Sequence, residues 1–70
     1  MIVYKRKLKK EDVQQLDNDE ELIYYYSNNI AYTIVSIDNS YVIRKKKVFN
    51  NQLVDEKFVK TIEQILKVVG

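Results

Sequence analysis

The chain contains no histidine, cysteine, proline or tryptophan, and its single glycine is the last residue, Gly70. Histidine is the side chain that titrates near neutral pH, and cysteine is a strong nucleophile and a soft-metal ligand. A serine–histidine–aspartate triad and a zinc site built from histidine or cysteine are therefore excluded. A glycine-rich nucleotide-binding loop is excluded as well, because no glycine lies inside the chain.

Carboxylates are the remaining catalytic option, either as an acid–base pair or as ligands of magnesium. The densest acidic group is Asp17, Asp19, Glu20 and Glu21. This group lacks the central glycine and the closing glutamate of a calcium-binding loop. The simpler interpretation is that these residues form a solvated loop, whose charges discourage strand addition to the aggregation-prone strand at 22–26. We therefore expect no enzymatic activity, and no metal, cofactor or small-molecule substrate.

The chain of 70 residues predicts one domain, residues 1–70, whose core must be efficient or shared because nothing cross-links it. Its apolar content of 46% makes such a core feasible. No apolar run approaches the length of a membrane span, and the N-terminal residues lack the charged-then-apolar order of a signal peptide. We expect a cytoplasmic protein, located in the cytoplasm of the host cell if the chain is viral.

Alternation of β-branched and aromatic residues, separated by Asn, Asp and Ser turns, predicts strands at 2–8, 22–26, 30–37 and 41–49. A short helix from Lys10 to Leu16 is predicted after the first strand. The last segment has an amphipathic pattern that predicts a long C-terminal helix, with Asn51 or Asp55 as its N-cap. Its apolar side is formed by Val54, Phe58, Ile62, Ile65, Leu66 and Val69.

These elements predict an α+β fold: an antiparallel sheet of three to four strands, arranged as a meander, with the C-terminal helix packed on one face. In the strand at 22–26, Leu22, Tyr24 and Tyr26 point to one face, and Ile23 and Tyr25 point to the other. Both faces are thus apolar, but only one substantial helix is available to cover them. We therefore expect a second copy of the chain or another protein to cover the second face.

Six tyrosines in the chain supply amphipathic rings of the kind enriched at protein interfaces. Those on the strand face that the helix covers belong to the core, and those on the other face belong to an interface. The interface candidates are Tyr24, Tyr25, Tyr26 and Tyr32.

Nine of the twelve basic residues fall in two runs, although the net charge is only +2. If the first strand lies beside the strand at 41–49, the two runs form a stripe that contacts phosphates. Otherwise these lysines and arginines are a solvated edge that protects the sheet against strand addition. The candidates for polyanion binding are Lys5, Arg6, Lys7, Arg44, Lys45, Lys46 and Lys47.

The sequence favours a small non-enzymatic protein that binds another protein, with a homodimer as the expected assembly. Its bias towards Ile, Asn, Lys and Tyr is typical of AT-rich genomes, and its size is typical of phage, viral or plasmid accessory proteins. The hypothesis is therefore a protein that inhibits or modulates a host or defence protein. The alternative is a nucleic-acid-binding accessory or regulatory protein that uses the basic stripe. A carboxylate-dependent enzyme is the third option.

Overall fold

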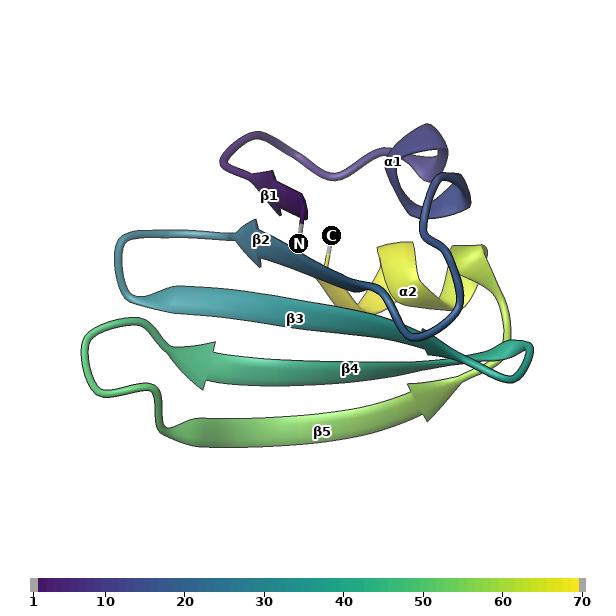
Figure 1. The fold of residues 1–70 in the computed structure, drawn as a ribbon. Coiled ribbons are helices and arrows are strands. Elements are labelled where there is room, and N and C mark those ends of the chain that lie inside the picture. The colour runs from purple at the N-terminus through teal and green to yellow at the C-terminus, as the bar shows by residue number, and fades with distance from the viewer. Residues whose placement is uncertain (1, 70) are drawn as a thin grey trace.

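A computed structural model describes residues 2–69 of the chain (Figure 1). The chain has five strands and two helices in an α+β arrangement, with four consecutive strands between the helices, which confirms the predicted fold class. The elements are β1 (Ile2–Tyr4), α1 (Lys10–Gln14), β2 (Glu21–Tyr25), β3 (Ile30–Ile37), β4 (Ser40–Lys47), β5 (Leu53–Val59) and α2 (Ile62–Val69).

The sheet has five strands in the order β1-β2-β3-β4-β5, so the expected three to four antiparallel strands are corrected to a five-stranded mixed sheet. β2 to β5 form the antiparallel meander, but β1 runs parallel to β2, with Val3 opposite Ile23. Parallel neighbours need a crossover connection, and the segment that contains α1 provides it. β1 ends at Tyr4 rather than at the predicted Leu8, which instead turns into the core.

The predicted long C-terminal helix is wrong in its first half, because Leu53–Val59 form the edge strand β5 beside β4. The sequence pattern is misleading here for two reasons. Val54 and Phe58 are four residues apart, a spacing that fits a helix face. The alternation of the strand is also irregular, because a bulge interrupts its register with β4. As a strand, the segment pairs with the backbone of β4, whose outer edge a helix would have left open. Neither Asn51 nor Asp55 is the N-cap of the helix.

The C-terminal helix α2 begins after Thr61, where a capping box fixes its first turn. The backbone N–H of Gln64 donates to Oγ1 of Thr61 at 3.2 Å, and the N–H of Thr61 donates to Oε1 of Gln64 at 3.2 Å. This reciprocal pair satisfies two backbone donors at the helix start. Thr-x-x-Gln is a recognisable sequence signal, and it marks the point where the strand pattern gives way to the helix.

The two predicted hairpins, β2–β3 and β3–β4, close through polar turn residues as expected. Between β3 and β4, Asp38 and Asn39 have φ angles of 45° and 66°, the left-handed pair required by a two-residue type I′ turn. Between β2 and β3, Oγ of Ser27 accepts hydrogen bonds from the N–H groups of Asn29 at 3.3 Å and Ile30 at 3.2 Å. These turns set the register that decides which side chains share a sheet face.

Both helices pack on the same face of the sheet. Ile65 and Val69 of α2 and Val13 of α1 belong to one buried cluster with side chains of β2, β3 and β4. The strand residues of this cluster are Leu22, Tyr24, Tyr32, Ile34 and Ile43. The predicted packing of the C-terminal helix against one face is thus confirmed, and α1 joins it there. The residues that alternate with these along each strand point to the opposite face.

Candidate protein-interaction surface

The face of the sheet opposite α1 and α2, called the open face below, carries the residues that alternate with the core. The strand register places these side chains in rows across the sheet. In one row Val3, Ile23, Thr33, Arg44 and Glu56 are neighbours, and in the next row Glu21, Val35, Val42 and Phe58 are neighbours. No helix within residues 2–69 covers these rows, because both helices pack on the other face.

The centre of the open face is apolar and closely packed. Ala31, Thr33 and Val42 are buried even though they lie on this face. Their register neighbours on this face are the side chains of Tyr25, Ile23 and Val35, respectively. At the two sides of the sheet, Val3 is 46% exposed and Phe58 is 72% exposed. An apolar sheet face of this kind, with large apolar side chains exposed at its margins, is a candidate interaction surface.

The four candidate interface tyrosines lie on both faces. Tyr24 and Tyr32 are buried in the core beneath the helices. Tyr26 follows Tyr24 on that side, is 54% exposed, and packs its ring edge-on against both of them at centroid distances of 6.3 and 5.9 Å. Only Tyr25 lies on the open face, where it is half-buried. The structure therefore brings three of these tyrosines together, but as part of the helix-covered side.

The two basic runs do not form one stripe. Lys5, Arg6 and Lys7 follow β1 at one edge of the sheet, whereas 44–47 lie on β4, and β2 and β3 separate the two. β4 is also an interior strand, so the run is not an edge. Its side chains alternate: Arg44 and Lys46 are on the open face and the other two are on the helix-covered face.

Arg44 is already paired within the open face. Its Nε donates to Oε2 of Glu56 at 2.6 Å across the β4–β5 pair, and both side chains are partly exposed. Lys46 lies one row away, beside Ala31, and Ala31 is in turn beside Tyr25. Lys5 contributes with Tyr25 to a hollow of about 490 Å³ at this end of the sheet. Among the described residues, neither Lys5 nor Lys46 belongs to an ion pair.

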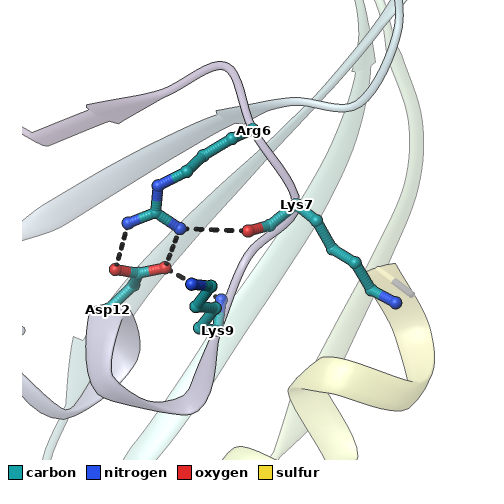
Figure 2. A network of polar contacts seen from close by, with 4 residues as sticks. All are labelled: Arg6, Lys7, Lys9 and Asp12. Carbon is teal, nitrogen blue, oxygen red and sulfur yellow. Dashed lines mark hydrogen bonds and ion pairs between the residues drawn. The ribbon is translucent and has the colours of Figure 1, made fainter.

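Arg6 serves a structural purpose in the connection between β1 and α1 (Figure 2). Its guanidinium makes a two-point contact with the carboxylate of Asp12, with both N···O distances at 2.8 Å. The same carboxylate accepts the backbone N–H of Lys9 at 2.8 Å, and Arg6 also donates to the carbonyl of Lys7 at 3.1 Å. Asp12 is buried, and these contacts make Arg6 a poor candidate for a phosphate ligand.

The hydrogen bonds from Arg6 hold the pKa of Asp12 below its usual range, although burial acts in the opposite direction. Burial raises the pKa of Tyr4, and the negative charge of Asp12 adds to this effect. The guanidinium of Arg6 also lies 4.8 Å from the ring centroid of Tyr4, a cation–π distance. The cluster thus fixes the crossover connection that makes β1 parallel to β2.

Sequence reasoning missed the apolar margins of the open face. The sequence pattern predicts a helix at Phe58, and Val3 is not among the predicted interface residues. Alternation within the strands does place Val42 and Val35 on the face opposite the core. Phe58 had no such signal, because the bulge near Val54 and the charged residues of β5 obscure the strand pattern.

No family model, no curated protein and no solved structure matches the chain. Among residues 2–69, no group of three or more Asp or Glu side chains is placed to hold a metal ion. Within the same range, neither helix has the length and apolar character needed to cross a membrane.

Proposed function

We propose that the protein is a small non-enzymatic interaction protein that binds another protein through its open face. One observation carries the proposal: the apolar sheet surface formed by the half-buried side chains of Ile23 and Val35, which no helix in residues 2–69 covers. The exposed side chains of Val3 and Phe58 extend this surface to both sides of the sheet. A protein partner would bury them without any change in the fold.

The charges on the open face indicate the chemistry of the partner. Lys5 and Lys46 lie at the end of the face near Tyr25, and neither makes an ion pair within the described part of the chain. Interfaces combine an apolar centre with a polar rim whose charges are complementary. The partner that fits presents an apolar patch with carboxylates along one side of it.

A protein without catalytic residues acts on its partner by covering part of the partner's surface. We therefore extend the proposal to inhibition or modulation of the partner. We take the chain to be encoded by a phage or another mobile element, and its partner to be a host or defence protein. The support for this source is the composition, rich in Ile, Asn, Lys and Tyr. Binding to nucleic acid is less well supported, because the basic runs are separated and Arg6 and Arg44 are paired with carboxylates.

The test is capture of partners from a nuclease-treated lysate of the cells in which the chain acts. Ile37 lies two residues after Val35 on β3 and therefore on the same, open face. Val3→Asp combined with Ile37→Asp places two charges on this face, at positions that are 46% and 40% exposed in the folded protein. Phe49→Asp is the matched control, since Phe49 is an 80% exposed aromatic residue in the β4–β5 loop, outside the strand rows.

We expect the parent protein and Phe49→Asp to retain the same protein, and the double variant to lose it while staying folded by circular dichroism. If nuclease removes all capture, the nucleic-acid alternative is the better one. If the double variant captures as well as the parent does, the open face is not the binding surface.

A further inference from the structure

The outer edge of β5 is a long strand edge without a neighbour. β5 closes one side of the sheet with seven residues, whereas β1 closes the other with three. No strand within residues 2–69 pairs with this outer edge, and all of β5 except Val59 is exposed. The free N–H and C=O groups of such an edge are a template for one more strand.

We propose that β5 pairs with β5 of a second copy of the chain, antiparallel about a two-fold axis at Glu56. The two five-stranded sheets would then form one continuous sheet, with both open faces on the same side. This strand edge borders the open face and shares Glu56 and Phe58 with it, but the pairing does not depend on the function proposed for that face.

The charges of β5 select this register. Directly opposite residues of an antiparallel strand pair point to the same face of the sheet. A two-fold axis perpendicular to the sheet therefore lies between one residue of β5 and the same residue of the second copy. With Glu56 at the axis, Asp55 lies opposite Lys57 of the second copy, and this pair occurs twice. Opposite charges on directly facing residues stabilise a strand pair.

Neighbouring registers are unfavourable. With the axis at Asp55 or at Lys57, two like charges meet at the axis, as the two Glu56 side chains do in the proposed register. Lys57 or Asp55, respectively, then faces an apolar residue, and no pair of opposite charges forms. The register at Glu56 also brings Val54 close to Phe58 of the second copy, and these residues are 48% and 72% exposed in the single chain. The bulge next to Val54 makes this contact less regular than the central pairs.

The two Glu56 carboxylates that meet at the axis are each neutralised from within their own chain. Nε of Arg44 lies 2.6 Å from Oε2 of Glu56 on the open face. Across the joined strands the two Glu56 carboxylates are adjacent, and each has the guanidinium of its own Arg44 on its other side, so neither carboxylate lacks a cation. Charged side chains on an edge strand commonly protect it against pairing, but here the opposite signs of Asp55 and Lys57 make the edge complementary to itself.

The test is a charge exchange followed by sedimentation velocity from about 1 µM to about 500 µM, the range over which a weak dimer forms. Lys57→Asp places Asp55 opposite a second aspartate, and Asp55→Lys places two lysines opposite each other. We expect each single variant to raise the dimer dissociation constant by about tenfold or more, because two attractive pairs become repulsive. The combined variant Asp55→Lys/Lys57→Asp restores both pairs and is expected to restore the dimer.

Circular dichroism establishes that each variant is folded. Recovery of the dimer in the combined variant Asp55→Lys/Lys57→Asp shows that the single variants lose the dimer through charge and not through misfolding. A parent protein that stays monomeric at the highest concentration overturns the proposal, as does a dimer that is indifferent to both single changes. Val3→Asp with Ile37→Asp is the control for the other surface. If that pair dissociates the dimer and Lys57→Asp does not, the copies meet through their open faces and the β5 pairing is wrong.

Discussion

The rings of Tyr24 and Tyr32 stack across the β2–β3 pair, with centroids 6.3 Å apart and planes 19° apart. Both rings are buried beneath the helices. Tyr25, the next residue along β2, projects to the open face. Two consecutive tyrosines therefore have different purposes: one holds the core together, and the other lies on a surface available to a partner.

Replacing Tyr24 and Tyr25 separately is expected to separate stability from surface. Tyr24→Ala empties a core site and removes an aromatic pair, so it should lower the free energy of unfolding by about 3 kcal/mol or more. Tyr25→Ala removes a half-buried ring and should cost about 1 kcal/mol. Urea denaturation followed by circular dichroism measures both. Equal losses would mean that Tyr25 is as much a core residue as Tyr24.

The ion pair between Arg6 and Asp12 predicts a loss of stability in acid. Because the hydrogen bonds from Arg6 lower the pKa of Asp12 in the folded state, the carboxylate adds stability that is present above its unfolded pKa of about 4. That stability is lost as the pH falls through the lower, folded pKa. Asp12→Asn is therefore expected to destabilise the protein at pH 7 by about 1–2 kcal/mol, and by less at pH 2.

Urea midpoints between pH 7 and pH 2 measure this difference. Arg6→Gln supplies the cross-check, since removal of the arginine removes the hydrogen bonds that lower the pKa of Asp12. The two variants and their combination should be strongly non-additive, because both break one contact. A gap between parent and Asp12→Asn that stays constant down to pH 2 would contradict the role assigned to this ion pair.

The capping box at the start of α2 is expected to contribute about 1 kcal/mol. Thr61→Ala removes the acceptor of the Gln64 N–H, and Gln64→Ala removes the acceptor of the Thr61 N–H. Each should lower the thermal midpoint, whereas Thr61→Ser keeps the hydroxyl and should stay near the parent. Lys60→Ala, just outside the helix, serves as the control. Should Thr61→Ala melt with the parent, the box does not set the start of the helix.

The strands from β2 to β4 could be predicted because their evidence is local. Ile30 to Ile37 is rich in β-branched and aromatic residues and ends at Asp38 and Asn39, which tolerate the left-handed angles of a tight turn. β5 could not be recognised in the same way. Val54 and Phe58 match a helix face, and only the free edge of β4, a tertiary feature, favours the strand.

The sequence predicts that one face of the sheet is an interaction surface, but it does not predict which residues lie on that face. Alternation along β2 separates Tyr24 from Tyr25, yet which of the two meets the helix depends on the packing of α2. The basic runs were expected to meet if β1 lay beside β4, but strand order is a long-range property and β1 pairs with β2 instead. The contact of Arg6 with Asp12 likewise depends on the fold of the crossover.

Thr33, at the centre of the open face, predicts a stabilising substitution. Its Oγ1 atom is buried and has no hydrogen-bond partner among the described residues, and its register neighbours are Ile23 and Arg44. A buried hydroxyl without a partner costs free energy, and valine has nearly the same shape without that hydroxyl. Thr33→Val is therefore expected to raise the free energy of unfolding by about 1 kcal/mol.

Thr33→Ser is the matched comparison, because it keeps the hydroxyl and removes the methyl group, and it should destabilise the protein. Both variants are measured by urea denaturation, with the parent alongside. If Thr33→Val is the less stable of the two, the hydroxyl has a partner in solution, and an ordered water on the open face would be the candidate. Stabilisation by valine, in contrast, shows that the Thr33 hydroxyl is unpaired in solution and that the buried centre of this sheet face behaves as an apolar interior.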